Sequence, residues 1–441
     1  MTLKLLRGFM VFLPHWPKFK EVQAGKINLD QIAALLSVLD NPHKKLPPTI
    51  HVTGTNGKGS TIAFMRAILE AAGFKVHVYT SPHLERFNER IVIAGSEISD
   101  SYLFSILEEC RIAVEKNNID ISFFEATTAA AFLAFSRNVA DVVLLEVGLG
   151  GRLDATNIID NPAICVITPI SFDHMAFLGN TLAKIAYEKA CIIKQNVPCV
   201  VSMQTDEVHE VIESYAASKN AKLIRFEYDF GVSILRDGRL SYKSYDLSIM
   251  APSPSLGGHH QYVNAATAIA AISNLKGFKI SEQNIKDGIS NAKWKGRIQK
   301  VNHGRLKDLF PEQWEIILDG AHNEAGAQSF AAWLQDQTSI KTYLIIGMTR
   351  NRDIGRFISY FKGYVDRIIC VSVHSEPLSY RAQDMIHWIS DEDIKKITTI
   401  QEDINEAFSE ILRLEEGGEK IRVLVTGSLF LVADFLVANK N

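Results

Sequence analysis

The segment Thr53-Gly-Thr-Asn-Gly-Lys-Gly-Ser60 carries the clearest chemical signal in this chain of 441 residues. It lies between a run with strand character and a segment of helical period. Its glycines permit a tight turn whose N–H groups face an anion, and the N-terminus of the following helix adds positive potential. Lys58 lies where a lysine bridges the outer phosphates of a nucleotide. The segment predicts a triphosphate cradle formed by Thr55, Asn56, Gly57, Lys58, Gly59 and Ser60.

This loop departs from the general phosphate-binding loop in two ways. Gly59 separates Lys58 from Ser60, and no glycine stands five residues before Gly57. The hydroxyl is therefore displaced from the position that usually holds magnesium, so we do not assign the metal to Ser60. A plain glycine-rich turn between strand and helix is the alternative.

A carboxylate marks a second point of chemical interest. Glu146 lies at the end of the apolar run that starts at Val142, where an acid is costly to bury unless a cation or hydrogen bonds satisfy it. Mg²⁺ takes hard oxygen ligands and keeps much of its water shell, so one or two protein carboxylates suffice. Glu146 is a candidate magnesium ligand, and an ordinary buried ion pair is the alternative.

Positioning these groups requires alternating strands and helices. Continuous apolar runs bounded by Asp, Gly and Pro are typical of central strands in a parallel sheet covered on both faces. Alternating segments between about 222 and 251, with Asp237-Gly238 as a hairpin turn, predict a small antiparallel appendage. The first strands are expected at 49–53, 75–80, 142–147 and 164–168, and a helix at 61–72.

A second α/β alternation follows a helix over 261–275, with strands expected at 315–319, 343–347, 367–373 and 422–427. We therefore predict an N-terminal P-loop ATPase-like domain over 1–296, with a parallel sheet and the antiparallel appendage. A C-terminal Rossmann-like α/β domain is expected over 297–441. Two such domains form a cleft, which is a usual place for a small-molecule site.

Composition limits the classes of partner. With 47 Lys+Arg against 50 Asp+Glu the net charge is −3, so no excess of positive charge is available for a nucleic-acid backbone or an anionic membrane. No apolar run approaches the roughly 20 residues that span a bilayer. The five scattered cysteines, without a CxxC pair, favour a reducing compartment. The run Met1–Pro14 lacks a cleavage site, and we expect a cytoplasmic monomer.

The phosphate loop and six later segments, in order, resemble motifs of the Mur ligase superfamily, and within it of folylpolyglutamate and dihydrofolate synthases. The resemblance covers nearly the whole chain from about residue 49 and implies ATP-dependent amide ligation. A pteroate or folate carboxylate would attack the γ-phosphorus of ATP, and the amine of L-glutamate would then displace phosphate. The six segments are Ser81–Ile91, Glu146–Asn157, Ser171–His174, Tyr187–Ala190, Lys295–Gln299 and Asp319–Asn323.

The resemblance also implies roles for single residues. It makes Ser81, Glu146 and His174 magnesium ligands, and it makes Lys189 a carbamylated lysine. Carbamylation requires a neutral amine, which burial and a nearby metal charge would favour; a solvated helical lysine is the alternative. A monovalent cation is also compatible with the family. The residues expected to take part in catalysis are Lys58, Lys189 and His322.

The second half of the chain would close the nucleotide site. Asn264, Arg297 and Asp319 match family positions that contact ATP, while a linker salt bridge for Arg297 and a strand-end turn for Asp319 are the alternatives. His322 and Asn323, together with Ser428, are weaker candidates for the glutamate side. Aromatic faces and carboxylates suit a flat pterin ring with N–H donors, and plain core packing of the aromatics is the alternative. The pterin candidates are Phe123, Phe124, Glu125, Leu153, Asp154 and Ala155.

Two other functions stay open. Another Mur-type ligase would join a different amino acid and acceptor; only about 48 residues precede the first strand, whereas uridine-linked ligases usually carry a separate N-terminal domain. A P-loop phosphotransferase or nucleotide-binding regulator is the second alternative. It would leave the second domain and the segment Asp319–Asn323 without a role.

Overall fold

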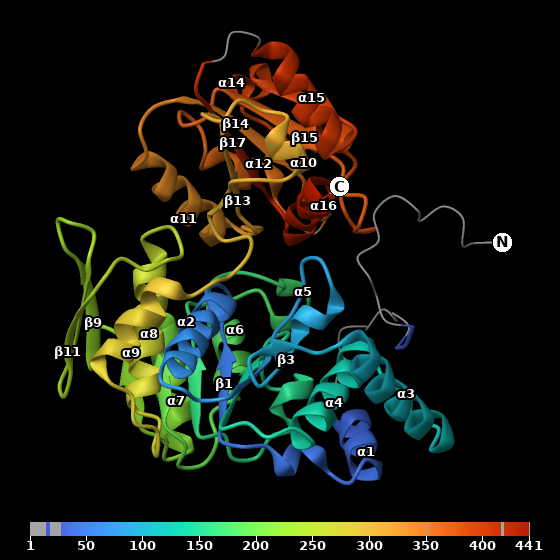
Figure 1. The fold of residues 1–441 in the computed structure, drawn as a ribbon, viewed down its shortest axis with the longest axis vertical. Coiled ribbons are helices and arrows are strands. Elements are labelled where there is room, and N and C mark those ends of the chain that lie inside the picture. Colours follow the sequence, from blue (N-terminus) through green and yellow to red (C-terminus); the bar gives the residue numbers. More distant parts are fainter. Residues whose placement is uncertain (1–14, 18–27, 351, 416–418, 441) are drawn as a thin grey trace.

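The computed structural model describes residues 15–17, 28–350, 352–415 and 419–440, so the N-terminal run 1–14 considered above lies outside the described residues. Two helix-covered sheets form two bodies, one above the other in Figure 1, and the chain passes between them after α9 (Glu282–Asn291). The predicted α/β class is confirmed in both.

The first sheet has eight strands in the order β4-β3-β2-β5-β1-β6-β7-β8. Every pair is parallel except those that β3 makes with β2 and β4. The central strands β5, β1 and β6 are buried along their whole length, as the continuous apolar runs predict. In chain order the strands are β1 (Thr49–Thr53), β2 (Val76–Tyr79), β3 (Ile91–Ile93), β4 (Ser96–Glu97), β5 (Val142–Glu146), β6 (Ile164–Ile167), β7 (Cys199–Val201) and β8 (Leu223–Arg225).

Helices cover both faces of this sheet because successive strand residues point to opposite sides. Val142 and Leu144 pack with α2, α8 and α9, whereas Val143 and Leu145 pack with α1, α3 and α4 on the other face. The helices are α1 (Asp30–Val38), α2 (Lys58–Ala71), α3 (Asp100–Lys116), α4 (Phe123–Ser136), α5 (Met175–Leu178), α6 (Leu182–Ala190), α7 (Asp206–Ser218), α8 (His260–Ser273) and α9, with short 3-10 turns at Pro42–Lys45, Phe87–Arg90 and Ala155–Ile158.

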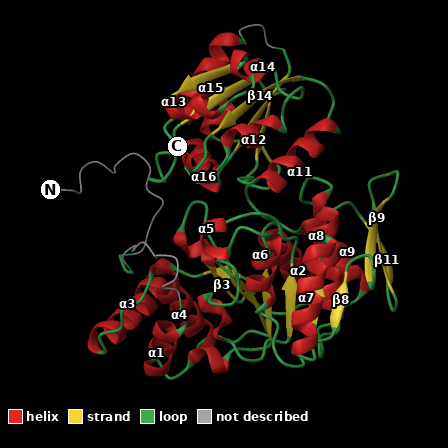
Figure 2. Cartoon of the chain, turned by 180° about the vertical axis from the view of Figure 1, so that it is seen from behind, coloured by secondary structure: helices red, strands yellow, loops and turns green. Residues whose placement is uncertain are grey.

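The antiparallel appendage exists, but it is shorter than expected. It is the three-stranded sheet of β9 (Phe230–Ile234), β10 (Leu240–Ser244) and β11 (Ser248–Ala251), visible at one side of Figure 2. The predicted range of about 222 to 251 wrongly included β8. That strand extends the main sheet instead, because its backbone pairs in parallel with β7 and Ile224 is buried between helices. Gly238 has the expected positive φ of 82° at the hairpin turn.

The second sheet has the order β12-β13-β17-β14-β15-β16, and only β12 is antiparallel to its neighbour. The predicted boundary at 296/297 falls just before β12 and stays a prediction. The strands are β12 (Gln299–Val301), β13 (Glu315–Leu318), β14 (Lys341–Ile346), β15 (Arg367–Val371), β16 (Thr398–Gln401) and β17 (Ile421–Thr426). The helices are α10 (Arg305–Asp308), α11 (Glu324–Gln335), α12 (Ile354–Ser359), α13 (Ala382–Met385), α14 (Glu392–Lys396), α15 (Ile404–Leu414) and α16 (Leu429–Lys440), with a 3-10 turn at Ile386–Trp388.

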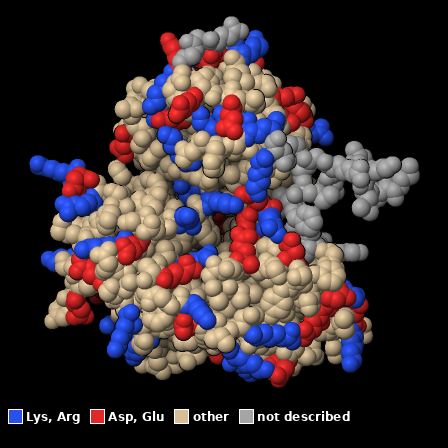
Figure 3. Space-filling model, in the orientation of Figure 1, with Lys and Arg blue, Asp and Glu red and all other residues tan. Residues whose placement is uncertain are grey.

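The distribution of charge on the surface can be compared with the partners expected from the composition. On the face shown in Figure 3, acidic and basic side chains are interspersed over both bodies. Among the described residues, none of the helices has the length and apolar character needed to cross a membrane.

Candidate active site

The phosphate loop connects β1 to α2 and has the backbone geometry that its glycines predict. Gly57 has a φ of 85°, and a Cβ there would lie 2.5 Å from Oδ1 of Asn264. The N–H groups of Thr55 and Asn56 donate to the carbonyl of Pro169, at 2.9 and 3.2 Å. Within the described structure, the N–H groups of residues 57–60 donate to no protein acceptor. The N–H groups that remain open to an anion are therefore those at the start of α2 rather than those of the whole loop.

Two lysines converge on the carbonyl of Gly54 at this loop. Nζ of Lys58 lies 3.2 Å from that oxygen, and Nζ of Lys189, from α6, lies 2.8 Å from it. Lys189 is only 5% exposed, which excludes the solvated alternative. Burial, reinforced by the charge of Lys58, lowers the pKa of Lys189 to about 7. A neutral amine is thus available near neutral pH, and carbamylation of Lys189 stays a prediction.

Gly59 and Ser60 show why this loop differs from the general pattern. A Cβ on Gly59 would lie 2.6 Å from Cζ2 of Trp294, so the indole occupies the space that a side chain would need. Ser60 is buried, and its hydroxyl accepts a hydrogen bond from Gln261 at 3.3 Å. Gln261 in turn accepts one from Asn264 at 3.0 Å. The Ser60 hydroxyl is therefore hydrogen-bonded to α8.

The three predicted metal ligands lie at the carboxyl edge of the first sheet. Glu146 is 4% exposed, and its Oε2 accepts the N–H of Ser81 at 3.1 Å. Burial raises the pKa of Glu146, whereas nearby cations, Lys58 first, favour its ionised form. His174 caps α5 with a φ of 49°, and burial lowers its pKa to about 4, so its imidazole is neutral.

This donor set fits a hard divalent cation. A buried carboxylate is stabilised by a bound cation, and a hydroxyl and a neutral imidazole can complete a site that keeps several waters. The described residues contain no group of three His, Cys, Asp or Glu side chains that could hold a metal by themselves. The ligand assignment stays a prediction.

Asp173, the residue before His174, joins the first domain to the second. Its Oδ2 accepts a hydrogen bond from Nδ2 of Asn323 at 3.1 Å, and Nε2 of His322 lies 3.5 Å from the same oxygen. Its Oδ1 forms an ion pair with Arg352. Although burial opposes ionisation, the hydrogen bond and charge of His322, with those of the neighbouring cations, hold the pKa of Asp173 far below its usual range.

A second bridge involves the phosphate loop itself. The side-chain amides of Asn56 and Asn323 exchange two hydrogen bonds, at 3.2 and 3.1 Å. Nδ1 of His322 donates to the carbonyl of Gly320 at 2.9 Å, which fixes the ring. His322, one of the predicted catalytic residues, therefore lies at the interface between the two domains, next to Asn323 and Asp173.

Arg297 and Asp319 lie next to each other at the domain junction. The two oxygens of Asp319 accept the N–H groups of Ile298 and Ala321, at 2.9 and 2.8 Å, so this carboxylate does form the strand-end turn. Arg297 makes no salt bridge with a described residue and donates to the carbonyl of Gly296 at 3.1 Å. Their contacts with ATP stay predictions. Ser428 caps α16 by accepting the N–H of Phe430 at 3.1 Å, and its place on the glutamate side also stays a prediction.

The predicted pterin residues come together where α4 meets the turn Ala155–Ile158. Their carboxylates serve local structure: Glu125 accepts the N–H of Ser122 at 2.9 Å in a capping box, and Asp154 accepts that of Leu149 at 2.9 Å. The neighbouring Leu153 and Ala155 carry no polar side chain. Phe123 and Phe124 remain the candidates for contact with a flat ring.

Sequence reasoning missed several residues of this region. Asp173 and Arg90 stand inside segments that resemble family motifs, so a signal existed for both. No sequence signal pointed to Trp294 or Arg352, because their contacts with Gly59 and Asp173 exist only in the folded chain.

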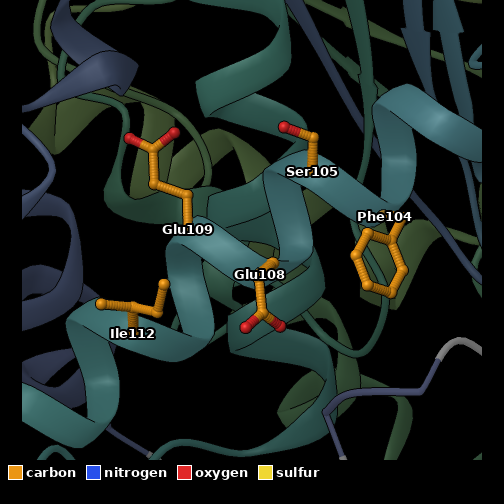
Figure 4. A pocket seen from close by; sticks show the side chains of 5 residues that line it. All are labelled: Phe104, Ser105, Glu108, Glu109 and Ile112. Carbon is orange, nitrogen blue, oxygen red and sulfur yellow. The ribbon is translucent and has the colours of Figure 1, made fainter.

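Two depressions on the surface hold none of the predicted site residues. One, of about 400 Å³, lies on the outer side of α3 (Figure 4) and is lined by Phe104, Ser105, Glu108, Glu109 and Ile112. Another, of about 500 Å³, lies past the carboxyl ends of β15 and β16 and includes Arg350, Arg381 and Glu402.

Comparison with known proteins agrees with the motifs along the chain. The family model of the Mur ligase middle domain matches residues 52–272, and that of the dihydrofolate synthetase C-terminal domain matches residues 299–438. The chain is 32% identical over 423 residues to a dihydrofolate synthase/folylpolyglutamate synthase of Bacillus subtilis, which covers 93% of this chain and 94% of the relative. An Escherichia coli protein of the same name is 34% identical over 358 residues, or 80% of this chain and 78% of that protein.

Solved structures extend this agreement to three dimensions. Escherichia coli FolC in complex with DHPP and ADP has a TM-score of 0.83 at 30% identity, covering 95% of this chain and 94% of that one. A bifunctional folylpolyglutamate synthase/dihydrofolate synthase of Yersinia pestis, complexed with AMPPNP and Mn ion, has a TM-score of 0.83 at 30% identity, covering 95% of each chain. The chain therefore belongs to the folylpolyglutamate synthase/dihydrofolate synthase family of the Mur ligase superfamily.

Proposed function

We propose that this protein is an ATP-dependent ligase that joins L-glutamate to 7,8-dihydropteroate, to the glutamate tail of reduced folates, or to both. The observation that carries the proposal is the arrangement of residues where the two domains meet. It places a helix N-terminus with free N–H groups and Lys58 next to the buried Glu146, and Asp173 ties the second domain against them. Relatives that match nearly the whole chain are dihydrofolate synthase/folylpolyglutamate synthases, which supports the same function.

In the first step the acceptor carboxylate becomes an acyl phosphate. The N–H groups of residues 57–60 and the ammonium of Lys58 hold the phosphates, with Asn264, Arg297 and Asp319 as proposed nucleotide contacts from the other side. A carboxylate oxygen attacks the γ-phosphorus, the bond from that phosphorus to the bridging oxygen breaks, and ADP leaves. Mg²⁺ held by Ser81, Glu146 and His174 would supply charge neutralisation at the phosphate oxygens.

In the second step the amine of L-glutamate attacks the acyl carbon. The tetrahedral intermediate collapses, inorganic phosphate leaves with the C–O electron pair, and the nitrogen loses a proton to give the amide. The contacts of Asp173 and Asn56 with the second domain hold it over the loop, which keeps water from the acyl phosphate. His322 and Ser428 are proposed to face the glutamate side.

The proposal has further components. Lys189 is proposed to be carbamylated, since its buried amine has a pKa near 7, and a monovalent cation remains part of the prediction. We also propose a cytoplasmic monomer that acts on small molecules, with no nucleic-acid or membrane partner. The five cysteines are all free thiols, which supports a reducing compartment.

The deciding assay measures phosphate release from Mg-ATP and L-glutamate with either 7,8-dihydropteroate or a tetrahydrofolate monoglutamate. Mass spectrometry of the products must show the mass of one added glutamyl residue. Phosphate release that neither acceptor stimulates, without a glutamylated product, would contradict the proposal.

A further inference from the structure

Two arginine side chains are buried in the described part of the chain, and only one of them has a carboxylate partner. Arg422 is 3% exposed and lies 2.9 Å from Glu315. Arg90 is 9% exposed, yet no carboxylate oxygen of a described residue lies within 4.0 Å of its guanidinium. Because a buried charge without a partner costs free energy, an anion bound at Arg90 would stabilise it.

A histidine fixes the direction of this guanidinium. Nε of Arg90 donates to Nδ1 of His83 at 2.8 Å. Since arginine only donates, Nδ1 must be the accepting nitrogen and the ring proton lies on Nε2. Both terminal nitrogens of Arg90 remain without a hydrogen bond to a described residue.

The position of Arg90 lies between the candidate pterin site and the candidate metal site. Its guanidinium carbon is 5.4 Å from the ring centroid of Phe87 and 5.7 Å from that of Phe123. The guanidinium of Arg90 also interacts electrostatically with the carboxylate of Glu146. An acceptor whose ring contacts Phe123 and whose carboxylate approaches the γ-phosphate near Glu146 must bring that carboxylate towards Arg90.

We propose that Arg90 binds the acceptor carboxylate that is phosphorylated in the first step, with His83 as its positioning residue. This inference rests on the proposed function and adds the group that orients the nucleophile. The carboxylate and ATP are both anionic, so a buried cation next to the nucleophile offsets their repulsion while they approach. A guanidinium also fits a carboxylate with two parallel hydrogen bonds, which aligns the attacking oxygen.

The test removes the two charges one at a time. Binding of 7,8-dihydropteroate and of its decarboxylated analogue is measured by titration calorimetry in the presence of Mg-ADP, for the wild type and for Arg90→Met. In the wild type we expect the carboxylate to strengthen binding by about 30-fold or more. In Arg90→Met both ligands should bind with nearly equal affinity, and Arg90→Lys should keep part of the discrimination.

Matched controls separate this role from a structural one. Arg422→Lys, at the other buried arginine, should discriminate between the two ligands as the wild type does. Melting temperature and Mg-ADP affinity verify that each variant is folded. His83→Ala should raise the KM for dihydropteroate more than that for ATP. If Arg90→Met weakens both ligands equally, or still discriminates between them, the inference is wrong.

The proposed function has its own readout, the assay of glutamylated product described above. Wild-type protein that forms glutamylated product while Arg90→Met retains discrimination overturns the role of Arg90 alone. Absence of product from the wild type overturns the proposed function, and the inference with it.

Discussion

The domain junction where we propose that the nucleotide binds has two walls, and they are built in different ways. The first-domain wall comes from consecutive residues, 54–60, at one junction between β1 and α2. The second-domain wall is assembled from residues after three strands: His322 and Asn323 after β13, Arg352 after β14 and Ser428 after β17. The first wall is complete within one domain, whereas the second acts only when the domains are docked.

Docking itself is unevenly distributed over the interface. Near the loop, the side chain of Asp173 is 6% exposed and that of its partner Arg352 is 13% exposed. Elsewhere, the buried Glu85 pairs with Lys440 of the second domain and with Lys295 just before the predicted domain boundary, and these lysine side chains are 58% and 53% exposed. Water screens the second set far more than the first, so the contact at Asp173 should dominate.

Lys58→Ala tests the wall that the first domain forms alone. Loss of the ammonium should lower kcat/KM by about 1,000-fold or more, because this cation acts on the transferring phosphate. Its Nζ bonds only to loop carbonyls, so the melting temperature should change little. Phosphate release and thermal unfolding are the measurements. Activity within about tenfold of wild type would show that the loop is not the reaction centre.

Asp173→Asn tests the wall that depends on docking. Removing the charge breaks the ion pair with Arg352 and weakens the contact with His322, so we expect kcat to fall by about 30- to 100-fold. ATP affinity should fall less, since the loop is intact. Arg352→Met removes the same ion pair from the other domain and should lower kcat in the same direction, which separates docking from any effect on the neighbouring His174. An unchanged kcat in Arg352→Met would show that the second wall does not depend on this contact between the domains.

The same difference explains what the sequence could predict. The loop was predictable because glycines, a lysine and a helix start lie within eight consecutive residues. The central strands were predictable from continuous apolar runs such as 142–146. Arg352 was not, because its partner Asp173 is 179 positions away and the contact exists only after two domains have docked.

Three carboxylates in the motifs show a second limit. Glu125, Asp154 and Asp319 were interpreted as ligand contacts, and each accepts backbone N–H groups close to it in the fold. A motif reveals that an acid is needed but does not tell whether it binds a ligand or the backbone. The ligand contacts of these three carboxylates stay predictions. Arg90 shows a related limit, because its burial without a carboxylate partner becomes visible only in the folded chain.

Lys189→Met tests how the buried amine next to the phosphate loop affects the stability of the fold. The pKa of Lys189 is about 7 in the folded protein against an ordinary lysine value of 10.5, so the unfolded state binds more protons between these values. Burial of Lys189 therefore lowers the free energy of unfolding by its full amount below about pH 7, and this destabilisation disappears as the pH rises towards 10.5. In buffer without CO₂, Lys189→Met should melt a few degrees higher than wild type at about pH 6, with a smaller gain at about pH 10, and should lack activity. A gain that does not depend on pH would contradict the buried neutral amine.

Glu85→Gln should have the smallest effect and sharpens the comparison between the two docking contacts. It removes a charge that holds Lys295 at 2.7 Å and also pairs with Lys440, both of them largely hydrated. We expect kcat to change by no more than about threefold, and the difference from wild type to vanish at high salt. Steady-state kinetics at low and high ionic strength measure this. A loss as large as that of Asp173→Asn would show that docking strength is spread over the whole interface, and the second wall would then depend on the full domain contact rather than on the residues beside the loop.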